Sequence, residues 1–230
     1  MTWGNNLIEA IVFDFDGLII DTETPEFDTW QEVFDSYGVS LERDVWEWAI
    51  GRHSDDFNIY KHLAELSGQH IERAEVRPRM RRRYLERIDE NPVLPGVKEY
   101  LAAAKDMQLK LAVASSSLPG WAKGHLNSRE LLHYFEFVLD AGDVKRAKPA
   151  PDLYTMAVDR LGVRPENALA IEDSMHGLTA AKAAGLYCVV VPNPMTDRMK
   201  FDTADMRLAS LASLPLDALL AELNGRLEWV

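Results

Sequence analysis

Five short apolar runs, separated by stretches of helical pattern, constrain the fold of this chain of 230 residues more than any other feature. Each run is rich in Val, Ile, Leu, Ala and Phe and lacks polar alternation, which is typical of parallel strands covered on both faces. The runs are residues 11–15, 109–114, 137–139, 169–171 and 187–191. Strand and helix alternate along most of the chain, which predicts an α/β fold with a doubly wound, Rossmann-like parallel sheet.

Residues 22–90 interrupt this alternation, because they contain no convincing strand. Aromatic side chains recur at helical spacing between residues 27 and 37. Three more helical patterns follow, the second beginning near Ser54 and the third marked at its start, or at a kink, by Pro78. We therefore predict two domains: residues 1–21 and 91–230 form an α/β core, and residues 22–90 form an inserted helical bundle.

The charge balance and the cysteine content limit the partners and the compartment of the chain. Acids outnumber bases by 37 to 25, for a net charge of −12, so we expect neither a nucleic-acid partner nor an anionic membrane. No stretch approaches the roughly 18 apolar residues of a membrane span. The single cysteine, Cys188, excludes an internal disulfide and favours a reducing compartment. The N-terminus lacks a signal-peptide pattern, so we expect a cytoplasmic protein, and we expect it to be a monomer.

Two carboxylates end the first apolar run, in the sequence Phe13-Asp14-Phe15-Asp16-Gly17. Burying Asp14 for packing alone is costly unless the carboxylate is paired or coordinated. Ligands of parallel sheets bind outside the carboxyl ends of the strands, which is where both acids fall. Asp14 could instead cap a turn, but a second acidic pair at another strand end favours a functional site.

That second pair, Glu172 and Asp173, ends the fourth apolar run. Two acidic strand ends side by side repel each other unless a cation lies between them. Ligand sets made only of oxygen atoms favour Mg²⁺, so we expect this ion as the cofactor. Asp173 or the following Ser174 could also cap the next helix, which is compatible with a metal site nearby.

Two further segments suit a phosphoryl group. Ser115, Ser116 and Ser117 follow the second apolar run, where hydroxyl and backbone N–H groups can bind phosphoryl oxygens. Lys148 lies in Ala-Lys-Pro-Ala-Pro-Asp ahead of a helix, where it could neutralise the charge of a transferring phosphoryl group. Taken alone, a cluster of serines is usually a loop and a single lysine is usually a solvated surface charge. Together with the acidic pairs, however, the two segments favour a phosphate site.

In order and content, these four segments resemble the haloacid dehalogenase superfamily. The resemblance covers nearly the whole chain, including the helical insertion, where the family carries a cap. The stretch from residue 14 to residue 23, Asp-Phe-Asp-Gly-Leu-Ile-Ile-Asp-Thr-Glu, is most similar to the phosphatase and β-phosphoglucomutase branch. The resemblance implies a phosphatase that hydrolyses a small phosphorylated metabolite.

The same resemblance implies a role for each residue of the core. Asp14 attacks phosphorus and forms an aspartyl-phosphate, while Asp16 protonates the leaving oxygen and later takes a proton from the attacking water. Ser115 and Lys148 hold phosphoryl oxygens. Ser116 joins them in binding the substrate. Mg²⁺ is held by the Asp14 carboxylate, the backbone carbonyl of Asp16, Asp173 and Glu172.

In the cap, the candidate substrate-facing residues are Glu23, Glu26, Arg52 and His53. The leading alternative is a β-phosphoglucomutase-like mutase, whose cap carries a histidine where Glu26 falls and an arginine where Ser54 falls. A mutase must hold two phosphates, so the lack of these cations favours hydrolysis, although Arg52 could substitute in a shifted register. A non-catalytic module that binds phosphometabolites is a third reading, but none of the four polar segments is degraded. We also expect the cap to move as a rigid body about its two chain crossings.

Overall fold

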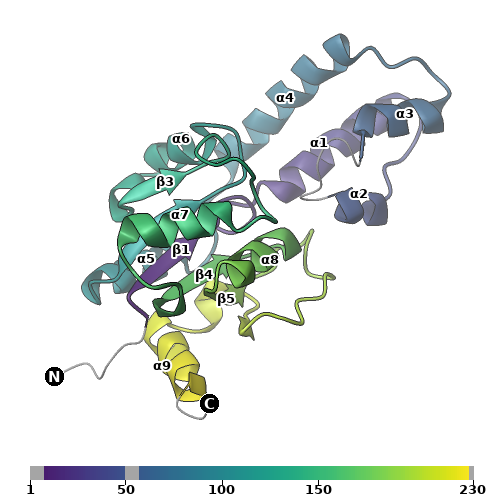
Figure 1. The fold of residues 1–230 in the computed structure, drawn as a ribbon. Helices are drawn as coiled ribbons and strands as arrows, with labels where there is room; N and C mark the ends of the chain where they lie inside the picture. Colours follow the sequence, from purple (N-terminus) through teal and green to yellow (C-terminus); the bar gives the residue numbers. More distant parts are fainter. Residues whose placement is uncertain (1–7, 50–56, 228–230) are drawn as a thin grey trace. The chain divides into compact units, whose positions relative to one another are not determined.

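The computed structural model describes residues 8–49 and 57–227, and these residues pack into two compact units (Figure 1). The α/β unit comprises residues 1–20 and 93–230, and the helical unit comprises residues 21–92. Val93 bridges to Ile20, and Leu94 N–H donates to the Ile19 carbonyl at 2.9 Å. The Asp21 carbonyl instead accepts from the Asn91 side chain at 2.7 Å. These contacts place the division after Ile20 and Pro92, one or two residues from the boundaries expected from the sequence.

The α/β unit is built on a parallel sheet in the order β3-β2-β1-β4-β5-β6, which confirms the predicted fold class. Its strands are β1 (Ala10–Phe13), β2 (Lys110–Ala114), β3 (Phe137–Leu139), β4 (Ala168–Glu172), β5 (Tyr187–Val190) and β6 (Met206–Arg207). Strands β1 and β4 are neighbours, and their register pairs Phe13 with Ile171. This register brings the residues that follow, Asp14 and Glu172, to the same edge of the sheet.

Helices cover both faces of this sheet, because alternate side chains of each strand point to opposite faces. Ile11 and Phe13 lie in one apolar cluster with α5 (Val97–Asp106), α6 (Trp121–Ser128) and α9 (Leu216–Leu227). Ala10 and Val12 lie in a second cluster with α7 (Asp152–Leu161) and α8 (Met175–Ala183). Since both faces are buried, a ligand can reach the sheet only at the ends of its strands.

The helical unit contains α1 (Glu23–Ser36), α2 (Arg43–Ala49), α3 (Ile59–Ser67) and α4 (Arg73–Glu90) (Figure 1). Its core includes the buried side chains of Trp30, Phe34 and Leu63. Pro78 lies inside α4 and does not mark its start, because Glu72 precedes the helix and accepts a hydrogen bond from Ala74 N–H. Asn58 caps α3; the expected cap, Ser54, lies outside the described residues.

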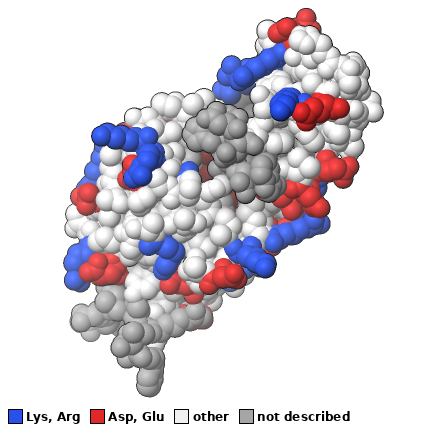
Figure 2. All heavy atoms as spheres, turned by 45° about the vertical axis from the view of Figure 1, so that its right-hand side comes forward, with Lys and Arg blue, Asp and Glu red and all other residues white. Residues whose placement is uncertain are grey.

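Charged side chains of the helical unit pair with one another at the surface. Arg83 lies 3.2 Å from Glu32 and 3.5 Å from Glu86, and Arg87 contacts Glu32 and Asp28. On the face of the molecule shown in Figure 2, basic and acidic side chains are interspersed. Among the described residues, no helix combines the length and the hydropathy needed to cross a bilayer.

Candidate active site

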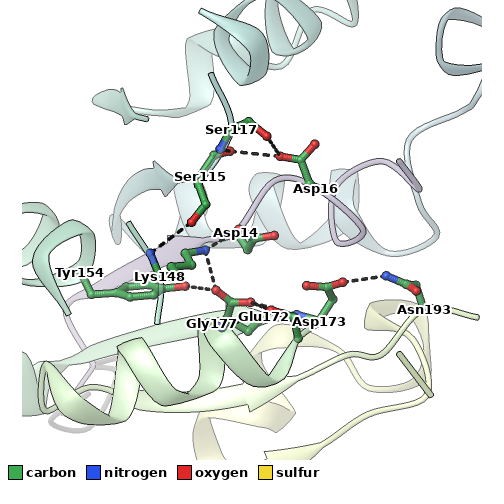
Figure 3. Close-up of polar contacts among 12 residues, drawn as sticks. Asp14, Asp16, Ser115, Ser117, Lys148, Tyr154, Glu172, Asp173, Gly177 and Asn193 are labelled. Atoms are coloured by element: carbon green, nitrogen blue, oxygen red, sulfur yellow. Dashed lines mark hydrogen bonds and ion pairs between the residues drawn. The ribbon is translucent and has the colours of Figure 1, made fainter. Parts of the chain in front are cut away.

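The carboxyl ends of three neighbouring strands gather the predicted acidic and serine residues (Figure 3). Asp14 follows β1, Ser115 follows β2, and Glu172 is the last residue of β4. The backbone continues the ladder here, since Asp14 N–H donates to the Ile171 carbonyl at 2.9 Å and Ser115 N–H to the Leu139 carbonyl at 3.0 Å. All three side chains are buried. The sheet itself therefore positions these groups.

Lys148 lies between two of these carboxylates (Figure 3). Its ammonium group is 2.5 Å from Asp14 Oδ1 and 2.6 Å from Glu172 Oε1, and its side chain is only 5% exposed. The ring of Tyr154 lies 5.1 Å from the ammonium nitrogen, and the Tyr154 hydroxyl donates to Glu172 Oε1. The lysine predicted as a phosphate ligand is thus a fixed, buried cation and not a solvated surface charge.

Glu172 is held at both of its carboxylate oxygens. While Oε1 faces Lys148 and Tyr154, Oε2 accepts from Asp173 N–H at 3.2 Å and from the Ser174 hydroxyl at 3.4 Å. A Cβ atom on Gly177 would lie 1.8 Å from the Glu172 carboxyl carbon, so only glycine fits there. Ser174 also caps α8 by accepting from Gly177 N–H at 3.2 Å, so the helix-cap role and the acidic cluster coexist.

The carboxylates of Asp14, Glu172 and Asp173 form a group that can hold a divalent cation. One oxygen from each lies within 4.8 Å of the others, and all three residues are buried. The donor set consists of oxygen atoms, which suits a hard divalent cation. Three carboxylates beside one ammonium group leave two negative charges, and a divalent cation would neutralise both. The cluster therefore fits a hard divalent cation.

Asn193 fixes the orientation of Asp173 (Figure 3). Its side-chain amide donates to Asp173 Oδ2 at 2.7 Å, while its Oδ1 accepts from the backbone N–H groups of Met195 and Thr196. Gly17, with φ of 77°, passes so close that a Cβ atom there would lie 2.3 Å from Asp173 Oδ2 and 2.4 Å from Asn193 Nδ2. Asn193 is not among the site residues expected from the sequence, although it follows the end of β5.

Burial and charge shift the protonation of this cluster in opposite directions. Burial raises the pKa of Asp14 from 3.8 to about 8; Lys148 opposes this shift, and Glu172 and Asp16 add to it. Burial alone would lower the pKa of Lys148, but the carboxylates of Asp14 and Glu172 outweigh it and hold the pKa above its usual value. Lys148 therefore keeps its proton and its positive charge. An ionised Asp14 carboxylate, in contrast, is unfavourable unless further positive charge lies beside it.

Asp16 lies in a different environment, because its described side-chain partners are neutral. Its Oδ2 accepts from the hydroxyls of Ser117 at 2.6 Å and Ser115 at 3.1 Å, and its Oδ1 accepts from the indole N–H of Trp121 at 2.8 Å. Figure 3 shows the two serines on one side of this carboxylate. Trp121 and Tyr154 are two further residues that the sequence analysis does not identify as part of the site.

The predicted substrate contacts are distributed between the two units. Ser116 accepts a hydrogen bond from the backbone N–H of Lys148 at 3.3 Å, which ties the serine segment to the lysine segment. Glu23 lies in the first turn of α1, in the helical unit. Arg52 lies outside the described residues. The structure thus brings together the candidate residues of the α/β unit and leaves those of the helical unit as expectations.

Comparisons with known proteins match most of the chain. The family model described as "Haloacid dehalogenase-like hydrolase" matches residues 11–191. YhcW of Bacillus subtilis (strain 168) is 43% identical over 220 residues, which cover 96% of this chain and 100% of that protein. Hexitol phosphatase B of Escherichia coli (strain K12) is 33% identical over 217 residues, covering 93% of this chain and 97% of that protein. The crystal structure of a β-phosphoglucomutase from Clostridium difficile is similar with a TM-score of 0.72 and 25% identity, over 95% of this chain and 99% of that one.

Proposed function

This chain belongs to the haloacid dehalogenase-like hydrolase family, and from that premise we propose that it is a Mg²⁺-dependent phosphatase acting on a small phosphorylated metabolite. The observation that carries the proposal is the buried contact of Lys148 with Asp14 and Glu172, at 2.5 and 2.6 Å. A carboxylate can approach an anionic phosphoryl group only where positive charge offsets their repulsion. Asp14 has that charge beside it, at the strand end where ligands of such sheets bind.

In the proposed reaction, an oxygen of Asp14 attacks phosphorus as the bond from phosphorus to the leaving oxygen breaks. This step forms an aspartyl-phosphate on Asp14. Water then attacks the phosphorus, which releases inorganic phosphate and restores the carboxylate. Lys148 and the hydroxyl of Ser115 hold phosphoryl oxygens, with Ser116 beside them, so that catalysis consists mainly of positioning and charge neutralisation.

Asp16 serves as the acid and then the base of this reaction. In the first step it gives its proton to the leaving oxygen, which therefore departs as an alcohol. In the second step its carboxylate accepts a proton from the attacking water. Its neutral partners, Ser115, Ser117 and Trp121, suit a group that must change charge twice in each turnover.

The proposed ligands of Mg²⁺ are the carboxylates of Asp14 and Asp173 and the backbone carbonyl of Asp16. Glu172 lies in the same group, but both of its oxygens already accept hydrogen bonds. We therefore assign Glu172 to orienting Lys148 and to adding negative charge beside the ion. When bound, the ion supplies positive charge that stabilises phosphoryl transfer.

The proposed substrate class is a phosphorylated sugar or polyol, which is the class named in hexitol phosphatase B. The helical unit would act as a cap, with Glu23 and Arg52 toward the substrate. The chain enters and leaves this unit at only two points, after Ile20 and after Pro92. Two such crossings suit a hinge, and a closing cap would exclude water from the first transfer.

A mutase remains the second candidate, because a β-phosphoglucomutase is among the similar solved structures. A mutase returns the phosphoryl group to a second hydroxyl and must therefore hold two phosphates, for which cap cations are best suited. At the positions where the sequence analysis expects those cations, this chain has Glu26 and Ser54. Glu26 would repel the second phosphate, which favours hydrolysis.

The test compares two products in one reaction mixture. β-Glucose 1-phosphate is supplied with Mg²⁺ and a glucose bisphosphate primer; a colorimetric assay follows inorganic phosphate and a coupled dehydrogenase follows isomerisation. Phosphate release should dominate, and Asp14→Asn, purified in parallel, controls for contaminating phosphatases. Isomerisation that exceeds phosphate release by about tenfold or more would show that the hydrolase assignment is wrong.

A further inference from the structure

We propose that Trp121 is a positioning residue for Asp16, and that its indole N–H fixes the carboxylate in the orientation needed for proton transfer to the leaving oxygen. The inference rests on the proposed function, because it gives Trp121 a part in that reaction. It concerns the surroundings of Asp16, where the described side-chain partners are neutral. Trp121 is the first residue of α6, and in the sequence β2 lies between it and Asp16.

The geometry separates the two oxygens of Asp16. The indole N–H of Trp121 donates to Oδ1 at 2.8 Å, whereas the hydroxyls of Ser117 and Ser115 meet Oδ2 at 2.6 and 3.1 Å. Each oxygen thus has partners of a different kind. The contacts on both oxygens fix the rotation of the carboxylate about its last bond.

The Trp121 indole and the two serine hydroxyls differ in the hydrogen bonds that they can form. An indole N–H can only donate, while a serine hydroxyl can donate or accept. A proton on Oδ1 would make that oxygen a poor acceptor for the N–H of Trp121, so the proton that Asp16 transfers belongs on Oδ2, where a serine can turn and accept it. Ser115, which we assign to the phosphoryl group, lies on the Oδ2 side. Trp121 therefore directs the acidic oxygen of Asp16 toward the position of the phosphoryl group.

The indole is itself held in place against the segment that carries Asp16. Its ring packs edge-on against His125 with centroids 4.2 Å apart, and His125 stacks on Phe15 at 6.2 Å. Phe15 is fully buried and lies between the two catalytic aspartates in the sequence. The chain before the helix is also tied, because Gly120 N–H donates to Asp140 Oδ2 at 3.0 Å. A donor held this rigidly can position a partner.

The role of Trp121 differs from that of Lys148, which is why it can be tested separately. The Lys148 ammonium places a positive charge beside Asp14 and Glu172, and its loss changes the electrostatics of the whole cluster. Trp121 carries no charge and has its described carboxylate contact with Asp16. Its loss should therefore weaken proton transfer while leaving the attack by Asp14 and phosphate binding largely intact.

The experiment uses two substrates that differ in their need for an acid. The sugar released from a sugar phosphate would be a strongly basic alkoxide without a proton, so this substrate requires the proton of Asp16. The 4-nitrophenolate released from 4-nitrophenyl phosphate is stable and requires little help. In Trp121→Phe, kcat/KM for the sugar phosphate should fall by about tenfold or more, because a hydrogen bond to a charged group is lost. The value for 4-nitrophenyl phosphate should fall by no more than about threefold.

Tyr100→Phe is the matched control, because it removes a hydroxyl that donates to the Leu214 carbonyl at 2.7 Å elsewhere in the α/β unit. It should change both substrates alike and only slightly. If Trp121→Phe fails to fold, benzothienylalanine introduced at position 121 keeps the shape of the ring and replaces the N–H by sulfur. The same split between substrates is then expected.

The outcomes separate this inference from the proposed function. Equal losses for the two substrates, or no loss for either, would overturn the role of Trp121 while a wild-type protein that releases phosphate upholds the phosphatase. If the wild type itself released phosphate from neither substrate nor from a wider panel of phosphometabolites, the proposed function and the inference would both be wrong.

Discussion

The α/β unit and the helical unit differ in how far their ion pairs are exposed to water. In the α/β unit, the side chains of Asp14, Glu172 and Lys148 are at most 9% exposed, and the Lys148 ammonium contacts both carboxylates. In the helical unit, Glu32 and Arg83 also form an ion pair, but their side chains are 47% and 50% exposed. The first arrangement removes charge from water and the second leaves it there.

This difference separates charged groups that are costly to bury from charged groups that remain hydrated. Burying ions is expensive, and replacing a buried ion pair by apolar side chains is often neutral or stabilising. The burial of Lys148 with its carboxylates is therefore better explained by a role in a reaction than by a contribution to folding stability. Surface pairs contribute little to stability. Substitutions in the buried cluster should therefore change activity, whereas substitutions in the surface pairs should not.

The largest effect is expected from Asp14→Asn. The substitution keeps the shape of the side chain and removes the proposed nucleophile, so kcat for phosphate release should fall by at least about 10³-fold. Asp28→Asn, which removes an exposed partner of Arg87 in the helical unit, is the matched control and should retain nearly full activity. Activity of Asp14→Asn within about tenfold of wild type would exclude Asp14 as the nucleophile.

The same variant should be at least as stable as the wild type without metal. Burial raises the pKa of Asp14 from 3.8 to about 8, so its contribution to stability is fully present below about pH 4 and is lost as the pH rises through 8. Asparagine does not titrate. The difference in melting temperature should therefore grow in favour of Asp14→Asn between pH 4 and pH 8, and a difference that shrinks over this range would contradict the burial argument.

Metal removal should have the next largest effect. EDTA should reduce phosphate release by at least about 10²-fold and Mg²⁺ should restore it, whereas Ca²⁺ should inhibit, because it takes more ligands at longer distances. Mg²⁺ at about 100 times its dissociation constant should also stabilise the protein by about 2.7 kcal/mol. Asp173→Asn should weaken that stabilisation, while Glu32→Gln should leave it unchanged. Equal rates in EDTA and in Mg²⁺ would rule out the metal site.

A smaller effect is expected where a single methyl group is added beside Glu172. The Cβ atom of Gly177→Ala would lie 1.8 Å from the Glu172 carboxyl carbon, so the carboxylate must move away from Lys148. We expect a loss of about tenfold in kcat and of about 1–3 kcal/mol in stability. Gly124→Ala, in α6, meets nothing within 4 Å and should be neutral or stabilising by about 0.5–1 kcal/mol. Similar behaviour of the two variants would show that the position of Glu172 is not critical.

The smallest effect is expected in the helical unit, from Glu32→Gln. A hydrogen bond from Arg83 lowers the pKa of Glu32 below 4.5, so its stabilisation is present above that pH and is lost as the pH falls through the lowered value. Because the side chain is 47% exposed, the variant should lose less than about 1 kcal/mol at pH 7, and less still in high salt. Thermal unfolding at pH 7 and pH 3 measures this; a larger loss at pH 3 would contradict the assignment.

The sheet and its acidic strand ends could be predicted from the sequence for one physical reason. Strands buried on both faces have continuous apolar runs, and a charged residue that ends such a run is conspicuous. The prediction missed β6 because its two residues, Met206 and Arg207, are too few to form a pattern. It allowed Pro78 to mark a helix start because proline is favoured in the first turn of a helix, but α4 begins five residues earlier, at Arg73.

The residues that support the site could not be predicted in the same way. Tyr154 lies on the apolar stripe of α7, and only the packing of that helix on the sheet brings its hydroxyl to Glu172. The contact of Trp121 with Asp16 joins residues 105 positions apart. Asn193 is different, because it is a polar residue just beyond the carboxyl end of a buried strand. The rule that identifies Asp14 and Glu172 applies to it as well.

The stereochemical course at phosphorus shows directly whether Asp14 forms a covalent intermediate. An in-line displacement inverts the configuration of phosphorus, so attack by Asp14 followed by attack of water gives two inversions. A phosphate monoester made chiral with oxygen isotopes is hydrolysed by the wild-type enzyme with Mg²⁺, and the configuration of the released phosphate is determined. We expect net retention. Net inversion would show that water attacks the substrate directly, and it would contradict a covalent intermediate on Asp14.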